Sequence, residues 1–543
     1  MNSAAIIGAG PGGLVAAKYL QQAGFTTTLF DEADGVGGQW RVGAPHSKAW
    51  PGMRTNTSRV LTAFSDLAHE PGTAVYPSVE QMGAYLARYA DRFALLAHAR
   101  FGTRVERVAR DGDGWLVRAR GADGGSHVER FSHVVVATGW NGRPVMPAVP
   151  GLATFTGRGG ATHTVAYRGA SRFRDLRVVV AGGGISALEV ASELAQQGAA
   201  RVIVASRRQR YVVQKLLAGV PADHLAFTRF AARAGESFPP EAVMAAMSAL
   251  VVGRCGSPEQ VGAPRPVGNF FEAGLTLSQS YLPLVAEGRI EPRGWLTRVA
   301  GDSAHFADGS TAEVDAIVFG TGYAPELSFL DAPVRAELGM DEDDPCAAPE
   351  LFRFTFHPAL PGLACLGLLE QIGPHFPTLE LQARWIAYTW SGRVPAPSPE
   401  QMRGGIAAAR ARAASAPTMA GHGVPMHVSA RMFAAAAGVE PDAAAWPALI
   451  RALFFGPLSP ASFRLSGPDA LPAAAARVAA DAAAFGAGAD GALTPEQRGQ
   501  LAALAAASGD RALAELVARF AEPAVRAPAD VAIGARRDTA AVS

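Results

Sequence analysis

A strand, a glycine-rich turn and a helix follow one another at two places in the chain, and this pattern constrains the fold most. In the first copy, an apolar run over residues 4–7 precedes G-A-G-P-G-G at 8–13, and helical apolar spacing covers 14–23. In the second, 177–181 precedes G-G-G-I-S-A at 182–187. Such a turn lets backbone approach a pyrophosphate, which then faces the helix N-terminus. The sequence therefore predicts two dinucleotide-binding domains.

The residues that follow each turn predict which nucleotide binds there. In the first turn, the three glycines of the motif permit the tight bend, let the backbone approach a phosphate, and let the helix pack closely on the strand. The next strand, over 26–30, ends at Asp31, whose carboxylate can accept the ribose hydroxyls, with Glu32 as an alternative. The strand after the second turn ends instead in Ser206, Arg207 and Arg208. Cations there suit the 2′-phosphate of NADPH, although a solvated basic cluster is the alternative interpretation.

Bulk properties exclude several classes of protein. A chain of 543 residues is too long for one core, and 49 Lys and Arg against 48 Asp and Glu give a net charge of +1, so we expect no nucleic-acid partner. The three cysteines, Cys255, Cys346 and Cys365, are far apart and give neither a zinc site nor the close pair that a disulfide reductase needs. Without a signal peptide or a membrane-spanning run, we expect a cytoplasmic protein that binds no membrane.

Further segments resemble the flavin-containing monooxygenases over roughly the first 480 residues. After the acidic residue, G-V-G-G-Q-W at 35–40 has the glycine pair and tryptophan of that family. The other matching segments are T-N-T-S at 55–58, F-S-D at 64–66, Y-P at 76–77, strands ending in T-G at 138–139 and 321–322, the returning segment at 367–385, F-G-P at 455–457 and R-L-S-G-P at 464–468.

The resemblance implies FAD at the first turn and NADPH at the second. The cofactor-binding residues expected from the turns and the matching segments are Gly8, Gly10, Gly13, Asp31, Gly38, Gln39, Trp40, Thr55, Asn56, Thr138, Gly139, Gly182, Gly184, Ser186, Ala187, Ser206, Arg207, Arg208, Thr321, Gly322 and Gln371. Asn56 matches the family's active-site asparagine, whose amide can hold the flavin peroxide or the nicotinamide without titrating. The alternative is a turn residue that caps its own backbone.

His163 is the second expected catalytic residue. The family fingerprint is F-x-G, three residues, His, three residues and an aromatic residue. Here Phe155 and Gly157 are followed by five residues before His163, and Tyr167 keeps its spacing after the histidine. The loop before the histidine is therefore two residues longer than in the family.

The same resemblance implies the reaction. NADPH reduces FAD, the reduced flavin adds dioxygen as a C(4a)-hydroperoxide, and one oxygen passes to an amine nitrogen or a thioether sulfur. The partners are then O2 and a small-molecule substrate. If Glu370 and His375 line the substrate space, they favour a polar, amine or amino-acid-like substrate. Baeyer–Villiger oxygenation of a ketone and an NADPH oxidase or redox-sensing flavoprotein are the alternatives.

We therefore expect an α/β fold with two doubly wound, Rossmann-like domains, one inserted in the other. The FAD-binding domain would span 1–150 and 327–483, and the NADPH-binding domain 151–326. A helical C-terminal extension at 484–526 would pack on the body or on a second subunit of a homodimer, and 527–543 would be disordered. The apolar face of the extension is formed by Leu501, Leu504, Leu513, Leu516, Val517 and Phe520.

Overall fold

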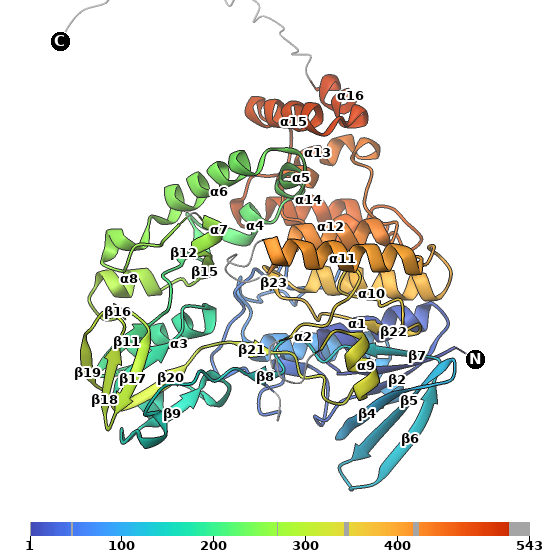
Figure 1. Cartoon of the computed structure of the whole chain (residues 1–543). Coiled ribbons are helices and arrows are strands. Elements are labelled where there is room, and N and C mark those ends of the chain that lie inside the picture. The colour runs from blue at the N-terminus through green and yellow to red at the C-terminus, as the bar shows by residue number, and fades with distance from the viewer. Residues whose placement is uncertain (1, 45–46, 269, 341–346, 416–422, 521–543) are drawn as a thin grey trace, which may run out of the picture.

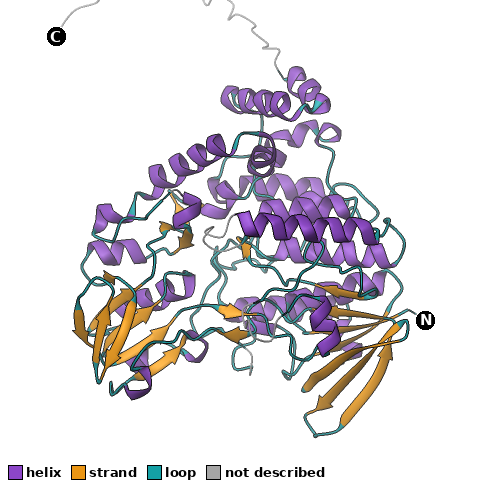
Figure 2. Cartoon of the chain, viewed as in Figure 1, coloured by secondary structure: helices purple, strands orange, loops and turns teal. Residues whose placement is uncertain are grey.

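Two parallel sheets form the centres of two lobes, and helices cover the space between and above them (Figure 1). Figure 2 shows the strands gathered in two separate lower regions with the helices above. The structure is a computed structural model that describes residues 2–44, 47–268, 270–340, 347–415 and 423–520. The tail expected to be disordered, 527–543, lies outside the described residues.

The first lobe is built on a five-stranded sheet in the order β22-β7-β1-β2-β3, and every pairing in it is parallel. Its strands are β1 (Ser3–Ile7), β2 (Thr26–Phe30), β3 (Ala99–Arg100), β7 (His133–Val136) and β22 (Leu363–Cys365). The chain thus leaves this sheet after β7 and returns to it more than two hundred residues later.

The second lobe repeats the arrangement with the chain between those two points. Its parallel sheet has the order β16-β11-β10-β20-β9. The strands are β9 (Gly160–His163), β10 (Arg177–Ala181), β11 (Arg201–Ala205), β16 (Glu291–Arg293) and β20 (Ala316–Phe319). The predicted α/β fold with two dinucleotide-binding sheets and a helical C-terminal region is confirmed.

The two passages between the lobes run side by side. The short strands β8 (Arg143–Pro144) and β21 (Tyr323–Ala324) pair antiparallel directly after the predicted T-G segments. Thr321 strengthens the join, since its hydroxyl donates to the carbonyl of Val145 at 2.6 Å. Antiparallel layers flank each lobe: β4 (Thr103–Asp111), β5 (Gly114–Gly121) and β6 (Ser126–Phe131) on the first, and β17 (Leu296–Ala300), β18 (Ser303–Phe306) and β19 (Thr311–Glu313) on the second.

The α-helices are divided between the two lobes. Those of the first lobe are α1 (Pro11–Gln22), α2 (Val79–Arg92), α9 (Ala332–Glu337), α10 (Phe376–Trp390), α11 (Pro399–Ser415), α12 (Met426–Ala436), α13 (Ile450–Phe455) and α14 (Ala474–Ala483). Those of the second are α3 (Ile185–Gln196), α4 (Ala222–Ala226), α5 (Arg229–Ser237), α6 (Pro240–Cys255), α7 (Phe270–Ala273) and α8 (Tyr281–Ala286).

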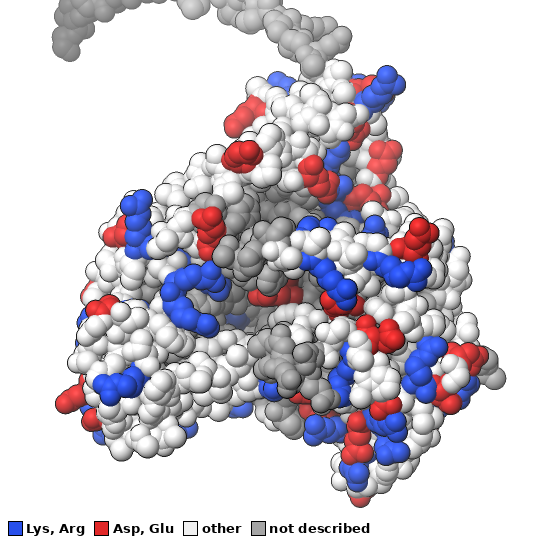
Figure 3. All heavy atoms as spheres, viewed as in Figure 1, with Lys and Arg blue, Asp and Glu red and all other residues white. Residues whose placement is uncertain are grey.

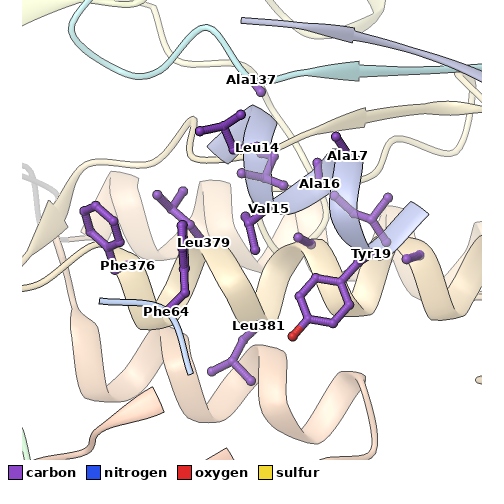
Figure 4. Close-up of a cluster of buried hydrophobic side chains, with 14 of the residues drawn as sticks. Leu14, Val15, Ala16, Ala17, Tyr19, Phe64, Ala137, Phe376, Leu379 and Leu381 are labelled. Carbon is purple, nitrogen blue, oxygen red and sulfur yellow. The ribbon is translucent and has the colours of Figure 1, made fainter. Parts of the chain in front are cut away.

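Helix α1 packs on α10, and this contact forms the centre of the largest apolar core. Leu14, Val15 and Tyr19 of α1 meet Leu379 and Leu381 of α10 in one cluster of buried side chains (Figure 4). Because α1 begins at the first glycine turn, the packing of α10 fixes the direction in which the N-terminus of α1 points.

A network of buried charged side chains joins α1 and α10 beside this core. Glu380 of α10 is 2% exposed and accepts from the hydroxyl of Tyr19 at 2.8 Å and from the backbone N–H of Ser65 at 2.8 Å. Arg464 lies 3.5 Å from the same carboxylate. The F-S-D and R-L-S-G-P segments are therefore joined to α1 and α10 by a single acidic side chain.

Three cations and three carboxylates share the network. Lys18 is paired with Asp66, and Arg384, which is fully buried, donates to the carbonyl of Phe463 at 3.0 Å and pairs with Asp469. Burial raises the pKa of the Asp66 carboxyl and lowers that of the Lys18 ammonium. Such charges are tolerated inside a protein only while each keeps its partner.

The C-terminal extension folds as a helical hairpin that packs on the body. It consists of α15 (Pro495–Ser508), which begins with a capping box at Thr494, and α16 (Arg511–Arg519), which is capped by Asp510. The apolar residues predicted for its inner face are buried or partly buried against α13 and α5. Asp510 also pairs with Arg233 of α5 at 2.6 Å, which ties the extension to the second lobe's helices.

Glu380→Gln tests the buried network. Removal of this charge leaves three buried cations with only Asp66 and Asp469 as counter-charges in the network, so the variant should lose about 3–5 kcal/mol of stability, measured by urea unfolding. Asp113→Asn is the control, because Asp113 pairs with Arg130 on the open surface and its loss should change little. Equal unfolding midpoints for the two variants would contradict the role of the network.

Candidate functional site

A cavity of about 1970 Å³ opens between the two lobes, at the carboxyl ends of both parallel sheets. Figure 3 shows the molecule hollowed there, with basic and acidic side chains around the hollow. Both turns, the helices α4 to α6, the short strand β23 (Gln371–Ile372) and α15 contribute to its wall. A crevice at this end of a parallel sheet is where such folds bind ligands.

The first turn is shaped so that only backbone occupies it. A Cβ on Gly8, whose φ is +106°, would lie 2.6 Å from the carbonyl oxygen of Ala137, and one on Gly13 would lie 1.8 Å from that of Gly8. Gly10 differs, since its nearest neighbour would be Gly38 at 3.6 Å, and it faces the cavity. Helix α1 starts directly after Gly10 with no side-chain cap. Its first backbone N–H groups are therefore available to a phosphate.

Asp31 stands at the end of β2 and borders the cavity. Its carboxylate accepts from the N–H of Ala9 at 2.6 Å and from that of Ala33 at 2.8 Å. Asp31 is 6% exposed, whereas Glu32 is exposed. The carboxylate of Asp31 is thus held against the first turn, and its binding of a ribose stays a prediction.

The second turn repeats the geometry with one substitution. A Cβ on Gly182, whose φ is +144°, would lie 2.3 Å from the carbonyl oxygen of Gly320. Ala187 takes the third position with its methyl group packed against Gly320, while a Cβ on Gly184 would have no atom within 4 Å. Helix α3 begins after Gly184 without a side-chain cap, and Ser186 in its first turn lines the cavity.

The predicted phosphate cations lie on the surface beside this turn. Ser206 lies next to Gly183, and Arg207 and Arg208 are exposed. The Arg207 guanidinium stacks 5.2 Å above the ring of Trp295. Neither arginine lines the cavity.

Asn56 lies in the wall of the cavity with an unsatisfied amide oxygen. The neighbouring Thr55 is 3% exposed. Its backbone N–H donates to the carbonyl of Pro77 at 2.9 Å, and its hydroxyl donates to the carbonyl of Thr57 at 2.8 Å. Oδ1 of Asn56 is enclosed and has no hydrogen-bond partner among the described residues. A buried amide oxygen left open in a cavity wall indicates that a donor completes it. The alternative that Asn56 caps its own backbone through this oxygen is not what the structure shows.

His163 ends β9, opposite Phe319 of β20, and does not line the cavity. The two extra residues of the loop are absorbed in a turn before the strand, where the N–H of Gly160 donates to the carbonyl of Gly157 at 2.9 Å. The ring accepts from the N–H of Val165 at 3.1 Å and meets the ring of Tyr323 edge-on at 5.0 Å. Burial lowers its pKa. The histidine fixes the passage between the lobes, so we assign it a positioning role.

The segment 370–375 borders the cavity as predicted. Glu370 is exposed to it, and Gln371 accepts from the hydroxyl of Ser429 at 3.1 Å. His375 is exposed at the cavity wall, where desolvation by the surrounding protein lowers its pKa to about 4. The shift favours the neutral ring, which offers hydrogen bonds rather than a charge.

The remaining predicted residues divide between the two regions. Gly38, Gln39, Trp40, Thr138 and Gly139 line the cavity. Thr321 and Gly322 lie at the passage between the lobes and outside the cavity wall.

The cavity lining includes ionisable residues that were not predicted from the sequence, and four of them bear on the chemistry of the wall. Lys215 pairs with Glu189 of α3 at 3.0 Å, and both line the cavity. Burial lowers the pKa of Arg210, while Glu370 raises it, so these two opposite charges influence each other across the wall. Asp223 is buried and accepts from the N–H of Ser58, two residues after Asn56. Arg210 could have been noticed because it follows the arginine pair by two positions, but no local pattern marks the other three.

No helix in the described part of the chain is long and apolar enough to cross a membrane. Among the same residues, no cluster of His, Cys, Asp and Glu could hold a metal ion.

Comparison with known proteins agrees with this geometry. A family model described as flavin-binding monooxygenase-like matches residues 1–482. N-oxide-forming dimethylaniline monooxygenase 2 of Mus musculus is 30% identical over 417 residues, which cover 74% of this chain and 75% of that protein. Human flavin-containing monooxygenase 2 is 29% identical over 414 residues, covering 73% and 75%.

Solved structures share the fold. S-allyl-L-cysteine S-oxygenase from Allium sativum superposes with a TM-score of 0.58 at 24% identity, over 80% of this chain and 88% of that one. Cyclohexanone monooxygenase from Rhodococcus sp. Phi1, bound to NADP+, gives a TM-score of 0.60 at 20% identity, over 81% and 97%. N-, S- and ketone-oxygenating enzymes thus share this architecture.

Gly10→Ala and Gly184→Ala should separate the two nucleotide sites. Neither methyl group meets an atom closer than 3.6 Å, so both variants should fold with unchanged melting temperature. Each methyl would instead intrude where phosphates approach the backbone. We expect Gly10→Ala to lose flavin on purification, and Gly184→Ala to keep flavin but show a raised KM for NADPH. Gly499→Ala in α15, which is equally uncrowded, is the control. Full flavin content in Gly10→Ala would contradict the assignment.

Proposed function

Because the chain belongs to the flavin-binding monooxygenase-like family, we propose that it binds FAD at its first turn and NADPH at its second, and transfers one oxygen atom of O2 to a soft nucleophile. The nucleophile is an amine nitrogen or a thioether sulfur. The observation that carries the proposal is a single cavity that joins both glycine turns to the open amide of Asn56.

The residues around the first turn fit FAD. Gly10 leaves room for a pyrophosphate, the uncapped start of α1 supplies N–H donors, and Asp31 is held in place for a ribose. Gly38, Gln39, Trp40 and Asn56 line the same cavity, so these residues would hold the flavin end of the cofactor. FAD supplies the redox chemistry, because it accepts hydride from NADPH and then activates O2.

The residues around the second turn fit NADPH. The uncapped start of α3 would hold the pyrophosphate, Ser206 lies beside the turn, and Arg207 and Arg208 are exposed cations that would attract a 2′-phosphate. Ser186 and Asn56 line the same cavity, so they would hold the nicotinamide end, which would supply hydride to the flavin.

Asn56 contributes hydrogen bonds of fixed strength across the working pH range. Its amide donates through Nδ2 and accepts through Oδ1, and neither group titrates. A preorganised amide in an enclosed site stabilises developing charge without reorganisation. We assign it to the reacting end of the cofactors.

The opposite wall favours a polar substrate. Glu370 offers a carboxylate to a cationic amine, Arg210 offers a guanidinium to an anionic group, and His375 offers a ring that can form hydrogen bonds. Charges of both signs in one wall suit an amino acid or an amine that carries a second polar group, as S-allyl-L-cysteine does for the Allium sativum enzyme.

The decisive experiment measures NADPH oxidation, O2 uptake and product mass for a panel of amines, amino-acid thioethers, aryl sulfides and cyclic ketones. We expect N- or S-oxides of the polar compounds, formed one per NADPH. In the variant Glu370→Gln, KM for the amines should rise several-fold while KM for the aryl sulfides stays the same. An ester from a ketone would instead identify a Baeyer–Villiger enzyme, and hydrogen peroxide with no oxygenated product would identify an oxidase.

The choice of NADPH over NADH is tested by replacing both Arg207 and Arg208 with alanine. Loss of two charge-assisted phosphate contacts should raise KM for NADPH roughly tenfold or more. KM for NADH, which lacks the phosphate, should stay within about twofold. Arg298→Ala removes an exposed arginine from the same lobe and should change neither value. Unaltered discrimination in the double variant would refute the assignment.

A further inference from the structure

A buried carboxyl group from the second lobe reaches the cavity wall next to Asn56. Asp223 lies at the start of α4 and is 4% exposed, yet it is part of the cavity lining. Its Oδ2 accepts from the backbone N–H of Ser58 at 2.6 Å. Because Ser58 is two residues from Asn56, this bond ties the T-N-T-S segment of the first lobe to the second lobe.

The other carboxyl oxygen is open. Oδ1 of Asp223 is enclosed and has no hydrogen-bond partner among the described residues, as is also true of Oδ1 of Asn56. Both side chains belong to the same cavity wall. Each of these unsatisfied buried oxygens indicates that a donor completes it. Asn56 can offer only an amide there, whereas Asp223 can hold and release a proton.

The next residue, His224, contacts Ser58, which also bonds to the carboxyl group of Asp223. Nε2 of His224 lies 3.1 Å from the hydroxyl oxygen of Ser58, and the ring packs edge-on against Phe485 at 5.2 Å. His224 is 1% exposed. Ser58 is therefore held between Asp223 and His224, and its position fixes the orientation of the carboxyl group.

Among the described residues the carboxyl group has no ion-pair partner, since Lys215, whose carbonyl accepts from the N–H of Ala222, pairs with Glu189. Burial raises the pKa of Asp223 to about 6, and hydrogen bonds from Ser58 and from the backbone of Asp223 and His224 partly oppose that rise. The facing titratable groups are Tyr76, whose pKa burial raises, and His224, whose pKa burial lowers to about 4. The carboxyl group therefore carries its proton over part of the physiological range.

The overall reaction needs such a proton. NADPH, H+, O2 and substrate X give NADP+, XO and H2O. One oxygen atom goes to X, and the other leaves as water with two hydrogens. The hydride of NADPH carries the electron pair and accounts for one of them, and a free proton accounts for the second. Any group that supplies this proton must lie at the enclosed, reacting end of the cavity.

We propose that Asp223, oriented by Ser58 and His224, delivers the proton consumed in each turnover to the reacting centre beside Asn56. The inference rests on the proposed monooxygenase function. Asp223 is then recharged from cavity water between turnovers. The carboxyl group comes from the second lobe, so the proton donor is in place only when both lobes hold their observed arrangement.

Asp223→Asn tests the proposal, because the amide keeps the acceptor for the N–H of Ser58 but cannot release a proton. Anaerobic reduction of the bound flavin by NADPH should keep its rate within twofold. The product formed per NADPH should fall at least fivefold, with hydrogen peroxide released instead. Asp302→Asn, an exposed carboxylate of the same lobe, is the control and should remain coupled. Full coupling in Asp223→Asn overturns the proposal, whereas a wild-type enzyme that forms no oxygenated product overturns the proposed function itself.

A second measurement does not depend on turnover. The folded wild type keeps the Asp223 proton up to about pH 6, while the unfolded chain loses it near pH 4. The carboxyl group thus lowers stability progressively as pH rises between these values, and Asp223→Asn does not. The melting temperature of the variant minus that of wild type should increase from pH 4.5 to 7. A difference independent of pH would show that the carboxyl group is not held protonated and would overturn the proposal.

Ser58→Ala is a further test of the role of Asp223, because the variant keeps the backbone N–H that donates to the Asp223 carboxyl group. Loss of the hydroxyl removes a bond that lowers the pKa of Asp223, so product formation per NADPH should persist to higher pH than in wild type. A shift to lower pH would contradict the arrangement.

Discussion

The contact between the first strand and the first helix of each lobe is the constraint on which the rest of the structure depends. At Gly13 and Gly8 in one lobe, and at Ala187 and Gly182 in the other, backbone meets backbone so closely that a larger side chain has no space. This approach aims the uncapped start of each helix at the carboxyl end of its sheet. Both helix ends face one cavity because the two passages, β8 and β21, run side by side.

The lobes are held together by polar contacts as well as by these passages. The indole N–H of Trp50 donates to Glu193 of α3 at 2.8 Å, and Ser58 donates to Asp223 of α4 at 2.6 Å. On the opposite side, Arg229 of α5 pairs with Glu440 at 2.9 Å. Each of these bonds joins a segment of the first lobe to a segment of the second lobe. The cavity wall is therefore a product of the interface, and neither lobe forms it alone.

The sequence predicts those features that depend on local geometry. The strands at 26–30 and 177–181 were predicted with the bounds that the structure shows, because short apolar runs beside a glycine-rich turn have few alternatives. The wall residues Asn56, Gln371, Glu370 and His375 came from family-like segments. Lys215, Glu189 and Asp223 were not foreseen, because their proximity depends on how an irregular segment after β11 folds back over the cavity. His163 was expected at the reacting centre, but the pairing of β9 with β20 places it at the passage between the lobes.

The distribution of polar groups over the two lobes has a chemical meaning. In the cavity wall the first lobe presents the amides of Asn56 and Gln371, which do not titrate, together with the ionisable Asp31, Glu370 and His375. The second lobe presents Lys215, Glu189, Arg210 and Asp223. Ionisable groups therefore reach the cavity from both lobes. Under the proposed assignment of NADPH to the second turn, the second lobe would bring both the hydride donor and Asp223 to the cavity, so the position of one lobe against the other would control both.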